Sequence, residues 1–247
     1  MPNERLRAAM AEHGLTHHAL AEDLGVNVKS VERWVLNDLL PFPRNRHAIA
    51  KRLDKEESYL WPDALTRDRA AAVSESEIVK VYPQRSDVPS DEWRQLLSAG
   101  NSEIGILVYA GLFLAEDAGI QRLLRKKAKA GARIRILLGD PLDQTVLNRG
   151  REEGIGDALA AKIRNAVTLY GDLATVDGVE FRLHRTVLYN SIFRADDRLF
   201  VNTHIYGLPA AQAPVWYLRK IPGGELATHY LESFERVWKD SAPMTED

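Results

Sequence analysis

Apolar positions in the first 64 residues recur at a spacing typical of short helices. In the run THHALAEDLGVNVKSVERWVLN, from Thr16 to Asn37, they fall three and four residues apart, which is the period of one face of a helix. Thr16 and Asn27 each suit the first cap of a helix, and Gly25 can adopt the left-handed conformation that ends one. The pattern predicts two short helices joined by a tight turn.

The second of these helices is predicted to bury Val31, Trp34 and Val35, because these residues share one face. Its other positions then face outward, and they include Val28, Lys29, Glu32 and Arg33. An exposed helix face of this kind is what a DNA major groove would meet.

From residue 78 onward, short apolar runs alternate with helical segments, an order typical of a layered α/β domain. Small, charged and serine residues at 65–77 predict a linker. We therefore expect an N-terminal all-α domain at 1–64, a C-terminal α/β domain at 78–240 and a flexible tail at 241–247.

The second domain is expected to begin and end with regular elements that surround a β-rich block. In chain order, the pattern predicts a strand at 78–82, a helix at 90–98, a strand at 103–109, a helix at 119–130, a strand at 133–138, helices at 142–149 and 157–169, a β-rich block at 179–218 and a helix at 225–239.

Composition narrows the classes of function. The 247 residues hold 33 Lys and Arg against 35 Asp and Glu, a net charge of -2, so binding to nucleic acid would need a local basic patch. The absence of cysteine excludes thiolate metal sites and cysteine nucleophiles and fits a reducing compartment. No apolar stretch approaches the roughly 18 residues of a membrane span. We expect a cytoplasmic, nucleoid-associated protein with no cofactor, no metal site and no membrane partner.

Basic charge is concentrated in the second half of the N-terminal domain. From Gly25 to Arg52 there are six basic residues and two acidic ones, while the rest of residues 1–64 has three basic and eight acidic residues. Segregation of this kind is expected of a side that faces DNA phosphates. The alternative is a small helical domain with solvated charges that binds another protein.

The run from Thr16 resembles the XRE (lambda-repressor-like) helix-turn-helix family, in which the form T-x-x-x-L-A-x-x-L-G-V precedes a capped recognition helix. The resemblance implies a DNA-binding domain that acts as a homodimer on an inverted repeat, with the dimer formed through the larger domain. The residues expected to contact DNA are Thr16, His17, Asn27, Val28, Lys29, Ser30, Arg33, Arg44 and Arg46.

The β-rich block carries two histidines and several polar residues at alternating positions. In a strand over 199–206, Asn202 and His204 would share a face, and His184 would share one with Arg182 in an earlier strand. Such a face suits a small anionic ligand or a protein partner. The residues expected to bind it are His184, Asn190, Arg194, Asn202 and His204. Both histidines could instead be structural, each held by hydrogen bonds.

The chain resembles proteins of the phospholipase D-like fold in its order of strands, in the segment AKAGARIRILLGD and in the later His, Asp and Asn residues. That superfamily has a His-x-Lys-(x)4-Asp motif followed by Gly-Ser-x-Asn, and it needs two such histidines. Aligned from His184, the chain has Thr186 at the lysine position and Ser191 at the aspartate position. Aligned from Asp196, it has Tyr189 for the histidine and Ser191 for the lysine. The resemblance therefore implies the fold without its catalytic residues.

The whole layout resembles actinobacterial regulators of the developmental WhiJ type, which join an XRE domain to a phospholipase D-like sensor. The leading hypothesis is a sequence-specific transcription regulator, expected to be a repressor and not an enzyme, whose second domain senses a ligand or partner. One alternative is a DNA-targeted phosphodiesterase or nuclease with His184 or His204 as nucleophile. Another is a protein-interaction adaptor.

Overall fold

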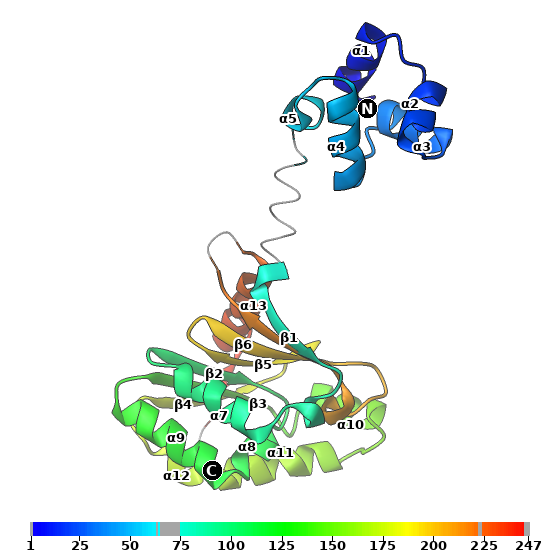
Figure 1. Ribbon diagram of the computed structural model, residues 1–247. Coiled ribbons are helices and arrows are strands. Elements are labelled where there is room, and N and C mark those ends of the chain that lie inside the picture. The colour runs from blue at the N-terminus through cyan, green and yellow to red at the C-terminus, as the bar shows by residue number, and fades with distance from the viewer. Residues whose placement is uncertain (1, 63, 65–74, 222–223, 245–247) are drawn as a thin grey trace. The chain divides into compact units, whose positions relative to one another are not determined.

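The computed structural model describes residues 2–62, 64, 75–221 and 224–244, and the chain divides into two compact units, residues 1–72 and 73–247. The N-terminal unit is helical, and the C-terminal unit is a mixed α/β domain built on one eight-stranded sheet (Figure 1). Residues 65–74 of the expected linker lie outside the described residues. Its last three residues, 75–77, belong to the second unit.

The N-terminal unit forms the two helices and the turn that its apolar pattern predicts. Thr16 Oγ1 accepts the N–H of Ala19 at 3.1 Å, Gly25 has a φ of 63°, and Asn27 Oδ1 accepts the N–H of Lys29 at 2.9 Å. All three predicted caps are thus confirmed. The described helices are α1 (Glu4–Glu12), α2 (His17–Leu24), α3 (Val28–Leu36), α4 (Pro43–Arg52) and α5 (Glu57–Leu60).

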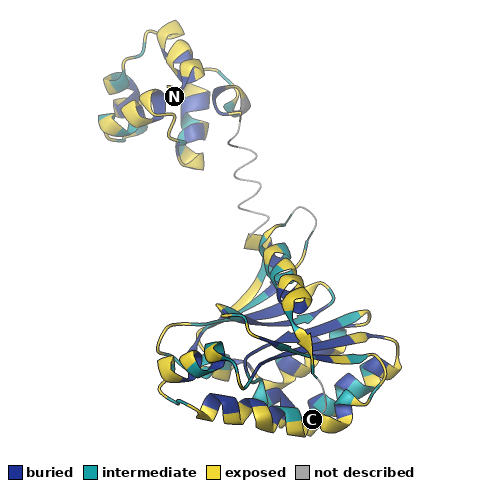
Figure 2. Ribbon diagram, turned by 180° about the vertical axis from the view of Figure 1, so that it is seen from behind, coloured by how far each residue is buried: buried dark blue, intermediate teal, exposed yellow. Residues whose placement is uncertain are grey.

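The core of this unit gathers apolar side chains from all five of these helices. Val31, Trp34 and Val35 are buried on the inner face of α3, as the helical period predicts. Figure 2 shows the same division along each helix, with buried and exposed residues on opposite sides. The packing of α3 therefore fixes which of its side chains face solvent.

The sheet of the second unit has the order β1-β7-β6-β5-β2-β3-β4-β8. β2, β3 and β4 are parallel to one another, and the other pairs are antiparallel. The strands are β1 (Ile78–Tyr82), β2 (Glu103–Leu107), β3 (Arg133–Gly139), β4 (Val179–His184), β5 (Asn190–Ala195), β6 (Arg198–Thr203), β7 (Val215–Arg219) and β8 (Ala242–Pro243).

Helices cover both faces of this sheet (Figure 1). On one face, Arg194 of β5 reaches Glu235 of α13, and on the other, Phe193 meets Trp93 of α7 edge to face. The helices are α7 (Ser90–Ala99), α8 (Leu112–Ala115), α9 (Ala118–Lys129), α10 (Gln144–Glu152), α11 (Ala158–Leu169), α12 (Gly171–Ala174) and α13 (Leu226–Asp240), with the 3-10 turns η1 (Arg85–Asp87) and η2 (Ala210–Gln212).

Two expectations about the ends of the second domain are wrong. The tail is ordered up to residue 244, because β8 pairs with β4 and the N–H of Met244 donates to the Phe181 carbonyl at 3.1 Å. Residues 245–247 lie outside the described residues. Glu77, which was expected in the linker, is fully buried, and its carboxylate accepts the N–H groups of Leu226 and Ala227 at 3.0 and 2.9 Å. It thereby caps the start of α13.

Candidate nucleic-acid interface and ligand cavity

The outer face of α3 carries two exposed cations. Lys29 and Arg33 lie four residues apart, so they are neighbours on one helix face. Thr16 and Asn27, at the starts of α2 and α3, are exposed too, while His17 and Ser30 are half-buried. The first turns of α2 and α3 hold no acidic residue that would repel phosphate. Thr16, His17, Asn27, Lys29 and Ser30 thus lie at the starts of α2 and α3, whereas Arg33 lies in the last turn of α3.

Most described cations of this unit have a partner within it. Arg52 is paired with Asp23 at 2.7 Å, Lys55 with Glu12 at 2.8 Å, and Arg5 donates to the Tyr59 carbonyl at 3.0 Å. Arg7 is paired with Glu4 on α1. The described part of the unit offers no carboxylate at ion-pairing distance to four exposed cations, which are Lys29, Arg33, Arg44 and Lys51.

Two residues of the predicted interface, Arg46 and Val28, are less exposed than the sequence pattern predicts. Arg46 is 3% exposed, and it donates to the Pro41 carbonyl at 3.0 Å and pairs with Glu57 at 3.5 Å. Its charge is therefore used inside the unit, where it ties the segment before α4 to α5. Val28 is half-buried and packs against the apolar core. The expectation that Arg46 faces a DNA groove is wrong, and Val28 presents only part of its side chain to solvent.

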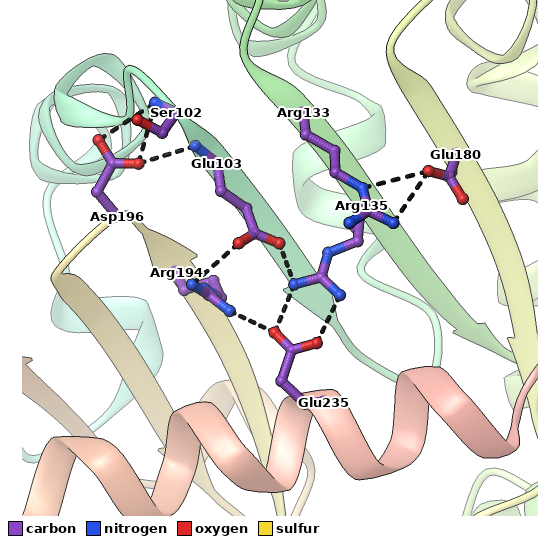
Figure 3. Close-up of polar contacts among 8 residues, drawn as sticks. All are labelled: Ser102, Glu103, Arg133, Arg135, Glu180, Arg194, Asp196 and Glu235. Atoms are coloured by element: carbon purple, nitrogen blue, oxygen red, sulfur yellow. Dashed lines mark hydrogen bonds and ion pairs between the residues drawn. The ribbon is translucent and has the colours of Figure 1, made fainter.

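The expected ligand residue Arg194 belongs to an ionic network on the α13 side of the sheet (Figure 3). Arg194 pairs with Glu103 at 3.2 Å and with Glu235 at 2.8 Å, and Arg135 contacts the same two carboxylates. Arg135 also lies 4.9 Å from the ring centre of Phe234. These groups join α13 to β2, β3 and β5, so Arg194 has a structural role and not the expected ligand-binding one.

Three other expected ligand residues also lie away from the cavity described next. His184 is 1% exposed, and its ring nitrogens contact the Val108 carbonyl at 3.1 Å and the Thr186 N–H at 3.3 Å. Asn202 is fully buried and donates to the carbonyls of Ala213 and Pro214. Asn190 is half-buried in the β5–β6 ladder. His184 and Asn202 are therefore buried and hydrogen-bonded within the fold, which contradicts the expected ligand-binding role for these two, while Asn190 does not line the cavity.

His204 is the expected ligand residue that lines a cavity. The cavity has a volume of about 210 Å³ and lies where the segment after β2 meets η1, η2 and α11. Its polar lining comprises Arg85, Tyr109, Glu116, Glu153, Lys162, Ser191 and His204. Ser191 is the residue that the alignment from Asp196 puts at the lysine position, so that alignment could have found it. Nothing in the sequence pattern marked Arg85 or Tyr109.

The hydrogen bonds of His204 settle its tautomer. Nδ1 lies 3.1 Å from the Leu188 carbonyl, which can only accept, so Nδ1 carries the proton. Nε2 lies 3.0 Å from Ser191 Oγ and accepts the hydroxyl proton. Burial, together with the nearby charges of Arg149 and Arg85, lowers the pKa of His204 to about 4. The imidazole is therefore neutral at physiological pH and brings no positive charge to the cavity.

Asp196 occupies the turn between β5 and β6 with a φ of 50°. Its carboxylate accepts the N–H groups of Asn101, Ser102 and Glu103 at 2.7 to 3.1 Å, and Figure 3 shows the contacts with Ser102 and Glu103. Burial acts to raise the pKa of Asp196, but these hydrogen bonds outweigh it and hold the pKa below its ordinary value. The aspartate thus fixes the hairpin that carries Ser191 and leads to His204.

The described residues contain no cluster of histidine, aspartate and glutamate that could hold a metal ion. None of the described helices combines the length and apolar character that crossing a membrane requires.

No protein-family model and no curated protein sequence matches the chain. Among solved structures, a phospholipase D family member, Nuc from Salmonella typhimurium, is 14% identical with a TM-score of 0.40, covering 68% of this chain and 97% of that one. TrmBL2, an archaeal chromatin protein whose structure shows a novel mode of DNA binding, is 14% identical with a TM-score of 0.43, covering 92% of this chain and 98% of that one. Likenesses at this level carry no argument about the chain's function.

Proposed function

We propose that the chain is a DNA-binding transcription regulator whose N-terminal unit makes the DNA contact. The observation that carries the proposal is the set of exposed cations without a carboxylate partner, with Lys29 and Arg33 on the outer face of α3 and Arg44 at the start of α4. Exposed and unpaired cations are free to displace counterions from DNA phosphates. Because α3 is held by its buried face, its outer face is presented as a rigid surface.

We further propose that the regulator acts as a homodimer on an inverted repeat, since one small unit offers few phosphate contacts. DNA fragments that the full chain selects from a random pool should share two half-sites whose centres are ~10 base pairs, or a multiple of this, apart. Light scattering of the complex should give two chains per fragment. Selected fragments without a shared sequence, or a complex with one chain, would contradict the proposal.

The second unit is proposed to sense a ligand or partner and not to hydrolyse phosphodiesters. Neither alignment with the phospholipase D motif retains its lysine, and Thr186 and Ser191 cannot supply a fixed positive charge to a transferring phosphoryl group. His184 is too deeply buried to attack a substrate. His204, whose pKa is lowered to about 4, would be a weak base at neutral pH.

The purified chain is accordingly expected to show no turnover of bis(p-nitrophenyl) phosphate above that of a His204→Ala variant. Both proteins should give the rate of the buffer alone in a spectrophotometric assay from pH 5 to pH 9. The contact between Ser191 and His204 favours the rival assignment, a hydrolase in which this pair reacts with substrate. Robust turnover that Ser191→Ala or His204→Ala abolishes would establish that rival.

A further inference from the structure

We infer that the cavity beside Ser191 and His204 binds a small organic carboxylate with an apolar body, with the carboxylate placed against Arg85. The inference names the class of ligand that the second unit would sense, and it rests on the sensing role proposed above. The argument has three parts, which are the unpaired charge of Arg85, the neutral hydrogen-bonding groups around it and the size and lining of the cavity.

Arg85 is a largely buried cation without a counter-ion among the described residues. Its guanidinium lies 4.2 Å from the ring centre of Phe113, and its backbone N–H donates to the Ala213 carbonyl at 2.9 Å. Glu153, whose charge reaches Arg85, is held by Arg149 at 2.7 Å. Burial lowers the pKa of Arg85 to about 10, so the group stays charged at neutral pH. An anion in the cavity would offset the unfavourable burial of this charge.

Apart from Glu153, which is paired with Arg149, the other inner polar groups are neutral. Tyr109 Oη accepts the N–H of Leu188 at 3.0 Å, which leaves its own proton available to a ligand. Ser191 and His204 are hydrogen-bonded to each other, and His204 is uncharged. Lys162 and Glu116 are both exposed and of opposite sign. A site with one inner cation favours a monoanion, whereas a phosphate dianion would be left with uncompensated charge.

The apolar residues of the cavity lining determine which apolar group the ligand can carry. Phe113, Leu112, Leu159 and Pro209 provide apolar surface next to the polar groups. A volume of about 210 Å³ exceeds the ~150 Å³ of an engineered apolar cavity that binds benzene, so it admits a carboxylate attached to one ring or a short chain.

The test is isothermal titration of the full chain, without DNA and in a buffer free of carboxylate and phosphate. The probes are benzoate, cyclohexanecarboxylate, acetate, neutral benzamide and phenyl phosphate. We expect saturable binding of benzoate or cyclohexanecarboxylate, with benzamide and phenyl phosphate at least about tenfold weaker, because a charge-assisted contact contributes about tenfold or more. Arg85→Gln should weaken carboxylate binding by a similar factor, and Arg85→Lys should restore part of it.

Arg122→Gln is the matched control, since Arg122 is an exposed cation of α9 outside the cavity lining. It should bind the carboxylates as the native chain does. The inference is overturned if neither benzoate nor cyclohexanecarboxylate binds saturably, if Arg85→Gln binds them unchanged while folded by circular dichroism, or if phenyl phosphate binds more tightly than benzoate. Because DNA is absent, a failure here is separate from a failure of DNA binding.

Discussion

Arg135→Ala is expected to lower the free energy of unfolding of the second unit by about 3–5 kcal/mol, the cost typical of breaking a buried ion pair by removing one partner. The Arg135 side chain is 3% exposed, and it donates two hydrogen bonds to Glu235 at 2.7 and 2.5 Å while also contacting Glu103. The variant would leave both carboxylates facing Arg194 alone and would remove the stacking on Phe234 and Trp238.

Arg133→Ala is the matched control, because Arg133 lies two residues earlier on β3. Its side chain is 53% exposed, and it pairs with Glu180 at 3.2 Å. An exposed pair of this kind contributes about 0–1 kcal/mol. Urea unfolding of the three proteins at pH 7 measures the difference. If both variants lose the same stability, the network of Figure 3 does not hold α13 to the sheet.

The same network predicts a pH dependence. The pKa of Glu235 is held below its ordinary value, chiefly by the hydrogen bond from Arg135. A carboxyl group whose pKa is lower in the folded state stabilises the fold above the unfolded-state pKa of ~4.3, and the stabilisation is lost as pH falls through the folded-state value. The gap in stability between the native chain and Arg135→Ala should therefore narrow as the pH falls below ~4.

Local signals were enough to predict most of the elements. The caps at Thr16 and Asn27 and the left-handed Gly25 depend on single residues, and the structure confirms them. The strand at 78–82 is confirmed residue for residue. The short helices α8 and α12 and the two-residue strand β8 were missed, because elements of two to four residues are shorter than any period that could indicate them.

The candidate site was harder to predict, because its residues meet only through tertiary contacts. Alternation along a strand separates two faces, but helices cover both faces of this sheet, so a polar residue on either face can be buried. The sequence pattern therefore could not distinguish His184 from His204, although of these two histidines only His204 lines the cavity. In the same way, counting basic residues in the first domain could not distinguish the buried Arg46, which pairs with Glu57, from the exposed Arg44.

Combined replacement of Lys29 and Arg33 by alanine is expected to weaken DNA binding by at least about 25-fold. Each base-edge contact is worth roughly 1–3 kcal/mol, and every 1.4 kcal/mol is a factor of ten. Both side chains are exposed, so the fold should be retained. Arg7→Ala is the control, because it removes an exposed charge on α1 that is already paired with Glu4. This variant should bind DNA nearly as the native chain does.

The most direct test of the DNA-binding proposal is the salt dependence of this affinity, measured by fluorescence anisotropy on a selected duplex from 50 to 200 mM salt. The logarithm of the association constant should fall linearly with the logarithm of the salt concentration for the native chain and for Arg7→Ala, with nearly the same slope. The double variant should bind more weakly, with a slope shallower by about one for each cation that contacts phosphate. Equal affinity and equal slope for the native chain and the Lys29→Ala, Arg33→Ala variant would contradict the assignment of α3 as the DNA-contacting helix.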